Sequence, residues 1–307
     1  MTELGILRPA TMNEVYQRNV GHLKRYNENT YKLVYMKSCR QSGYEDSAQN
    51  AAKGTKNTAG NTAKLNESLS RTRSTVYELA LCNEWEHFIT FTVSPDKYDR
   101  YDLRGYYKSF AKWINNLNFR KKLNIKHLII PEQHKDGAWH LHGLFMGIPQ
   151  GMLTRFTVND TLPHRVLNLI REGRELFNWG EYAEKYGHVT CERIQNLEAT
   201  AKYVTKYITK DLGESGVELN HHLYYASKGL NRAETIIKGT LCEEFEPDFA
   251  NEYVAVKTFK TLAEAIVYFA EGDSYAPPVT HDSLLTRFQR RLERRTTRWK
   301  NIPCPQT

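Results

Sequence analysis

The chain has 307 residues, of which 40% are hydrophobic and 25% charged, a balance typical of a globular protein. Its formal net charge of +8 favours a polyanionic partner, nucleic acid first. The five cysteines are scattered singly, which argues against a disulfide framework and a structural zinc site. No apolar run is long enough for a signal peptide or a membrane-spanning helix, so we expect a cytoplasmic protein without a membrane partner.

The sequence predicts three parts. Residues 1–72 are polar and basic with few large apolar groups, and we expect them to form an arm or linker rather than core. Residues 73–245 carry the strand and helix periodicities and form the predicted main domain. Residues 246–307 are expected to be a basic extension that ends in an arginine-rich helix, LLTRFQRRLERRTTRWK. That helix fits a solvated peripheral position as well as it fits DNA binding.

The main domain alternates strands and helices. In chain order we expect a helix at 76–82, a strand at 87–93, a helix at 102–118 with Asp102 as N-cap, strands at about 125–134 and 138–147, a helical insertion at 151–186, a strand at 188–194 and a helix from 197 that Gly213 can end. The stretches HHLYYASKG and AETIIKGTL are further strand candidates. This order is a split βαβ arrangement on an antiparallel sheet, an α+β fold of ferredoxin-like or RRM-like type with flanking helices.

The stretch HKDGAWHLHG places His140 and His142 two residues apart, so both imidazoles point to one face of a strand. If residues 135–137 form a three-residue hairpin loop, Glu132 lies opposite His140 on that same face. A two-residue turn would shift the register by one and bring Gln133 opposite His140 instead.

Two imidazoles and one carboxylate form a three-ligand set with open positions for water or substrate. The set His140, His142 and Glu132 suits Mg²⁺ or Mn²⁺ at a phosphate-handling site, and zinc is not excluded. The alternative is an ordinary alternating strand with polar residues on its wet side.

The stretch AKYVTKYITKDL places Tyr203 and Tyr207 four residues apart on a predicted helix, hence on nearly one face. Lys206 and Lys210 follow each tyrosine by three residues and lie near that face. A tyrosine nucleophile needs help to ionise, which a neighbouring ammonium or a metal can give, and lysine can also anchor a phosphate. The alternative is an aromatic stripe that packs on the sheet.

Three ordered motifs together resemble the HUH endonucleases, specifically the two-tyrosine rolling-circle replication initiators of phages and plasmids. They are FITFTVSP at 88–95, WHLHGLF at 139–145 and YVTKYITK at 203–210. The resemblance covers about 85–240, more than half of the chain.

The resemblance implies a mechanism. A metal held by His140, His142 and Glu132 polarises the scissile phosphate of a single-stranded origin or origin hairpin. Tyr203 or Tyr207 then attacks, which leaves a 5′-phosphotyrosyl link and a free 3′-hydroxyl, and the reaction can reverse to rejoin the strand. The setting implied is the cytoplasm of a bacterial host cell.

The chain contains no G-x-x-x-x-G-K-[ST] phosphate loop, so a separate host helicase and polymerase are expected partners. Two other functions remain open on the sequence. One is an HUH-type transposase that uses the same chemistry, and the other is a non-catalytic single-stranded nucleic-acid-binding protein, since a split βαβ sheet with exposed aromatic side chains also suits that role.

Overall fold

The computed structural model describes residues 7–8, 16–40, 59–210, 222–241, 245–251, 254–265 and 281–300. The chain divides into two compact units. One, here called the central unit, is Lys53–Arg232, and the other, the terminal unit, combines Met1–Ala52 with Ala233–Thr307. Within the described ranges, no helix has the length and apolar character needed to cross a membrane.

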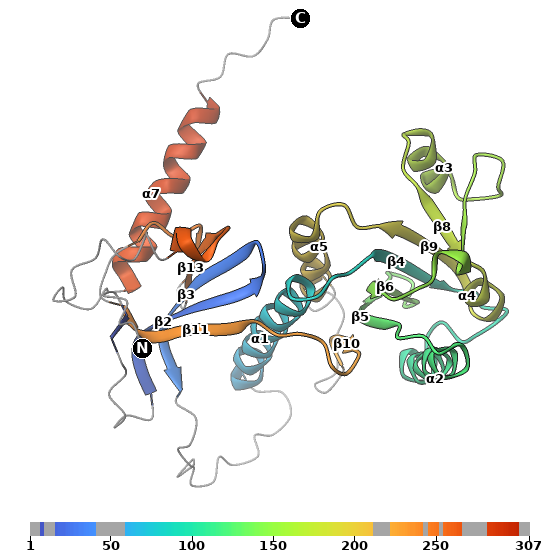
Figure 1. The fold of residues 1–307 in the computed structure, drawn as a ribbon, viewed down its shortest axis with the longest axis horizontal. Helices are drawn as coiled ribbons and strands as arrows, with labels where there is room; N and C mark the ends of the chain where they lie inside the picture. The colour runs from blue at the N-terminus through green and yellow to red at the C-terminus, as the bar shows by residue number, and fades with distance from the viewer. Residues whose placement is uncertain are drawn as a thin grey trace, which may run out of the picture. The chain divides into compact units, whose positions relative to one another are not determined.

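The central unit is built on one antiparallel sheet with the strand order β10-β5-β6-β4-β9-β8-β7 (Figure 1). Its strands are β4 (His87–Val93), β5 (Lys126–Gln133), β6 (Trp139–Met146), β7 (Leu153–Arg155), β8 (Leu176–Trp179), β9 (Gly187–Arg193) and β10 (Tyr225–Ala226). β6 lies between β4 and β5 and is antiparallel to both, so β4 and β5 run in the same direction. This confirms the split βαβ arrangement and the α+β fold class predicted from the sequence.

The helices of the central unit are α1 (Ala59–Leu81), α2 (Leu103–Lys121), α3 (His164–Arg171), α4 (Gly180–Lys185) and α5 (Leu197–Lys210), with a 3₁₀ turn at Gln150–Met152. Asp102 caps α2 as predicted, because its side chain accepts a hydrogen bond of 2.9 Å from the Gly105 amide. Helix α1 begins 17 residues earlier than the helix expected at 76–82, in a stretch whose composition suggested a linker.

Alternation along β4 gives the sheet two different faces. Ile89, Phe91 and Val93 are buried and pack in one hydrophobic core with the apolar side of α2 and with Tyr182 and Tyr186 from the α4 region. The intervening residues of β4 point to the opposite face, on which α5 and α1 lie side by side (Figure 1). One face therefore holds the core, and the other is left for polar side chains.

The insertion at 151–186 was expected to be helical, which is wrong for part of it. Residues of this segment form β7 and β8 and continue the sheet beyond β9, with α3 between them in the chain. Pairing of β8 with β9 supplies the backbone hydrogen bonds that a short apolar run such as Leu176–Trp179 needs, and this partner is not visible locally.

The terminal unit contains a second antiparallel sheet in the order β1-β11-β2-β3-β13-β12. Its elements are β1 (Leu7–Arg8), β2 (Tyr16–Asn27), β3 (Thr30–Arg40), β11 (Glu234–Leu241), β12 (Phe249–Ala250), β13 (Val254–Phe259) and the helix α7 (His281–Lys300). Leu23, Leu33 and Tyr35 are fully buried in its core, and Leu284 of α7 belongs to the same cluster.

The prediction that residues 1–72 form an arm or linker is therefore wrong for β2 and β3, which are joined by a tight turn and carry core side chains. The predicted boundary at 245 also differs, because β11 pairs with β2 in the terminal unit. The predicted C-terminal helix is present as α7. The expected linker at 41–58 and the end of α5 near Gly213 lie outside the described residues.

Candidate active site

The β5–β6 hairpin has the register that the three-residue loop predicts. Glu132 pairs with His140 and Gln133 with Trp139, so the two-residue turn that would place Gln133 opposite His140 is wrong. The His134 amide donates 2.8 Å to the Ala138 carbonyl, and Gly137 adopts a left-handed conformation at φ 84°. This loop sets which side chains share the polar face.

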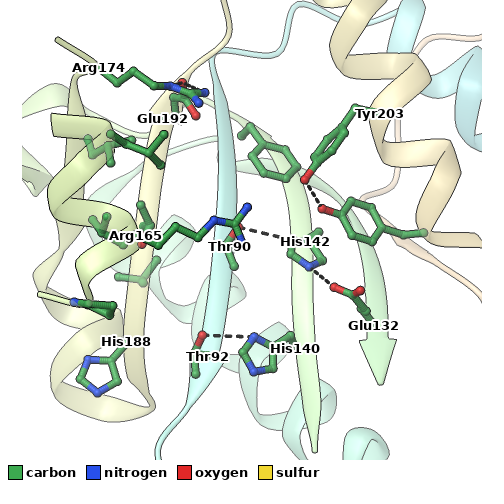
Figure 2. Close-up of a pocket in the computed structure, with 18 of the residues that line it drawn as sticks. Thr90, Thr92, Glu132, His140, His142, Arg165, Arg174, His188, Glu192 and Tyr203 are labelled. Atoms are coloured by element: carbon green, nitrogen blue, oxygen red, sulfur yellow. Dashed lines mark hydrogen bonds and ion pairs between the residues drawn. The ribbon is translucent and has the colours of Figure 1, made fainter. Parts of the chain in front are cut away.

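Both histidines are oriented by threonines of the neighbouring strand. Thr90 Oγ1 lies 3.3 Å from Nδ1 of His142, and Thr92 Oγ1 lies 3.3 Å from Nδ1 of His140 (Figure 2). The pairing of β4 with β6 places each threonine directly opposite its histidine. Because Nδ1 is engaged on each ring, Nε2 is the nitrogen left for other chemistry, the arrangement that metal-binding histidines commonly use.

Glu132 contacts His142 rather than the histidine directly opposite it. Its Oε2 lies 2.7 Å from His142 Nε2, and both side chains are buried (Figure 2). The predicted ligand atoms thus pair with each other. In the described part of the chain, no three His, Cys, Asp or Glu side chains form a group that could hold a metal ion.

His140 is surrounded by groups that disfavour its charged form. Burial, followed by the neighbouring His134 and His142, lowers its pKa from 6.5 to about 4. The ring of His134 stacks on His140 with centroids 3.8 Å apart. At neutral pH, His140 is therefore a neutral imidazole with a lone pair available, which is the form that binds a metal.

Helix α5 packs with its aliphatic side and leaves its tyrosines outside the core. Ala201, Val204 and Ile208 are buried, whereas Tyr203 is 43% exposed. The two faces follow from the helical repeat, since residues 201, 204 and 208 share one side and residues 203 and 207 another. The alternative in which the tyrosines form a core stripe does not describe this helix.

The two tyrosines meet each other above His142. The Tyr207 hydroxyl donates a hydrogen bond of 2.5 Å to the Tyr203 hydroxyl, and the Tyr207 ring stacks on His142 with centroids 4.1 Å apart. Burial, the hydrogen bond that Tyr207 donates to Tyr203, and the Glu132 carboxylate raise the pKa of Tyr207 above its usual value. Tyr207 is therefore held as the protonated donor of the pair.

The predicted lysines are placed unequally. Lys206 lines the same groove as the tyrosines and histidines. Lys210 is the last residue of α5, and its side chain lies outside the described part of the structure.

All these side chains line one open groove of about 1870 Å³. Its floor is the polar face of β4, β6 and β9, which contributes Thr90, His142 and His188, and α5 forms one wall. The other wall comes from the insertion and includes Arg165, Val166 and Leu169 of α3. The basic side chains in the lining are Lys135, Arg165, Arg174, Arg193, Lys202 and Lys206. A basic groove with aromatic side chains suits a single nucleic-acid strand.

A comparison with known protein families matches the segment that carries this groove. Residues 86–212 match a family model described as a replication-associated protein of the ORF2 type. The replication-associated segment runs from just before β4 to just beyond α5 and contains both histidines and both tyrosines. The resemblance to rolling-circle replication proteins inferred from the motifs is confirmed. No curated protein and no solved structure matches the chain.

Within the replication-associated segment, four side chains of the groove were missed from the sequence. Thr90 and Thr92 alternate in FITFTVSP, so their common face was visible, but their pairing with the histidines depends on strand order. His134 was expected near Glu132, and its stacking on His140 was not. Arg165 had no local signal, because only the folded insertion brings it to the groove.

Proposed function

We propose that this protein is a rolling-circle replication initiator that nicks single-stranded origin DNA through a tyrosine and can rejoin the strand. The observation that carries the proposal is the meeting of the Tyr203 and Tyr207 hydroxyls above His142 in a basic groove. The match of residues 86–212 to a replication-associated family supports it. A binding module has no need for two hydroxyls in contact beside two fixed imidazoles.

Tyr203 is proposed to act first. Its oxygen accepts the hydrogen bond from Tyr207, and a donated hydrogen bond stabilises negative charge on the accepting oxygen. Tyr203 is also 43% exposed to the groove, so its own proton can pass to water. Tyr207, in contrast, would have to lose a proton that it shares with Tyr203 while facing the Glu132 carboxylate.

The proposed step is a transesterification. The Tyr203 oxygen forms a bond to phosphorus, the bond from phosphorus to the 3′-oxygen breaks, and that oxygen takes up a proton as the 3′-hydroxyl. The phosphodiester is replaced by a phosphotyrosyl ester, so no external energy source is required and the reverse reaction rejoins the strand. The free 3′-hydroxyl is the end that a polymerase extends.

The second tyrosine is proposed to act after one round of synthesis. Because the two hydroxyls lie 2.5 Å apart, a phosphate that reaches Tyr203 is also within reach of Tyr207. One helical turn separates the residues, which lets both serve the same site without a change of fold.

A divalent cation, Mg²⁺ or Mn²⁺, is proposed to bind to His140, His142 and Glu132. The donor chemistry fits, since both imidazoles are oriented through Nδ1 and His140 is neutral. Binding requires the hydrogen bond between Glu132 and His142 to open, which frees a carboxylate oxygen and a ring nitrogen. When bound, the cation supplies positive charge to the scissile phosphate.

The partners that follow from this proposal are a single-stranded origin or origin hairpin, a host helicase and a host polymerase. Helicase activity is assigned to a partner because the sequence lacks a nucleoside-triphosphate phosphate loop.

The test is covalent adduct formation. The full-length protein is incubated with Mn²⁺ and single-stranded oligonucleotides that tile the replicon encoding it, and products are separated under denaturing conditions. We expect one or a few oligonucleotides to give an adduct that survives denaturation. The proposal fails if no oligonucleotide gives one.

A matched set of variants shows whether the adduct depends on α5. Tyr203→Phe combined with Tyr207→Phe is expected to abolish the adduct, while Tyr101→Phe, which alters a tyrosine that is 58% exposed, is expected to leave it unchanged. An undiminished adduct in the double variant would place the nucleophile elsewhere.

A further inference from the structure

The insertion carries an arginine to the candidate active site from the side opposite the tyrosines. Arg165 is the second residue of α3, and its side chain lines the groove together with Val166 and Leu169 of the same helix. In Figure 2, Arg165 extends from α3 across the sheet toward Thr90 and His142, while Tyr203 approaches from the other wall.

Other cations of the groove are committed to protein partners. Arg174 Nε donates to Glu192 at 2.7 Å, Arg193 donates to Gln150 at 2.7 Å, and Lys202 lies 2.8 Å from Glu198. Within the described ranges, no hydrogen bond or ion pair engages the Arg165 guanidinium. Arg165 therefore points a charge into the groove that the protein itself does not neutralise.

The charge of Arg165 is felt at the tyrosine pair. Burial is the main cause that raises the pKa of Tyr207, and the Arg165 guanidinium acts in the opposite direction. An interaction of this kind places the guanidinium close enough to act on a phosphate that is attacked from α5.

We infer that Arg165 binds the non-bridging oxygens of the scissile phosphate and stabilises the charge that develops during attack by the tyrosine. A guanidinium has a planar set of donors that matches two phosphate oxygens, and it stays charged at any working pH. The DNA strand then runs between α3 and α5, with its phosphate held by Arg165 from one wall and approached by Tyr203 from the other. This inference rests on the proposed function.

The role predicts an effect on chemistry more than on binding. Loss of one preorganised donor to a developing negative charge slows the chemical step by about 100-fold or more. Binding of an oligonucleotide through many phosphates depends weakly on any one of them. Arg165→Ala should therefore slow single-turnover cleavage about 100-fold and change the dissociation constant of the oligonucleotide only a few-fold.

The experiment compares Arg165→Ala, Arg165→Lys and Arg171→Ala with the unaltered full-length protein on an oligonucleotide that the latter cleaves. Arg171 is the matched control, because it lies on the same helix, is exposed and donates to Asn168. We expect Arg165→Lys to keep part of the rate, and added guanidinium ion at millimolar concentration to restore part of the rate of Arg165→Ala. Arg171→Ala should cleave at the normal rate.

Two results would overturn the inference while leaving the proposed function intact. One is cleavage by Arg165→Ala at the normal rate. The other is a slow Arg165→Ala variant that guanidinium does not rescue and whose thermal unfolding midpoint is lowered, since that pattern indicates a structural role. If the unaltered protein forms no adduct with any oligonucleotide, the proposed function fails and this inference fails with it.

Discussion

The hydrogen bond between the two tyrosines predicts that their phenylalanine variants behave differently. Tyr203→Phe removes the proposed first nucleophile, so the first cleavage should be lost or carried slowly by Tyr207. Tyr207→Phe keeps the ring that stacks on His142 but removes the donor to Tyr203. It should leave the first cleavage slower but present.

The size of the second effect follows from the hydrogen bond. A hydrogen bond to a charged group contributes about 1.5–3 kcal/mol. The bond that Tyr207 donates strengthens as charge grows on Tyr203 during attack, so this range estimates the loss of transition-state stabilisation. It corresponds to a rate about 10- to 150-fold lower for Tyr207→Phe.

The assay is single-turnover cleavage of a labelled oligonucleotide under excess enzyme, with adduct and free 3′-hydroxyl fragment measured over time. The reasoning is refuted if Tyr203→Phe reacts at the normal rate while Tyr207→Phe forms no adduct. That outcome would make Tyr207 the first nucleophile despite its donor role.

Three further predictions concern the metal, the pH dependence and the core. Thr92→Val removes the hydroxyl that orients His140, so isothermal titration with Mn²⁺ should show an affinity about 10- to 100-fold weaker; an unchanged affinity would mean that the threonine does not support a ligand. Burial lowers the pKa of His127 from 6.5 to about 4, so the unfolded chain takes up this proton first as the pH falls. The free energy of unfolding should therefore decrease between about pH 6.5 and pH 4, by up to roughly 3 kcal/mol from this residue, and denaturant titrations should show a flatter profile for His127→Gln. Phe110→Ala empties a fully buried position and should cost about 3–5 kcal/mol, whereas Phe119→Ala, at a side chain that is 87% exposed, should change the unfolding midpoint little.

The local geometry of the site could be predicted because it depends on short-range rules. The strand at 87–93, the loop at 135–137 and the pairing of Glu132 with His140 follow from alternation and from loop length. The common face of Tyr203 and Tyr207 follows from the helical repeat.

The parts that sequence reasoning missed depend on distant partners. Alternation of Tyr31, Leu33 and Tyr35 was visible, but the polar surroundings concealed it, and the pairing of β2 with β11 joins segments about 200 residues apart. Arg165 reaches the groove only because β7 and β8 extend the sheet and carry α3 to its edge. The contact of Glu132 with His142, instead of its directly opposite neighbour, depends on rotamers that a register does not fix.

The most direct test of the account is to identify the amino acid that carries the DNA. Trypsin cuts after Lys202 and Lys206, so Tyr203 and Tyr207 fall in separate peptides, 203–206 and 207–210. The adduct is digested with nuclease and trypsin and analysed by mass spectrometry. The account predicts a 5′-linked nucleotide on the 203–206 peptide after the first cleavage. A nucleotide on a peptide from outside α5, or no covalent nucleotide on any peptide, would contradict it.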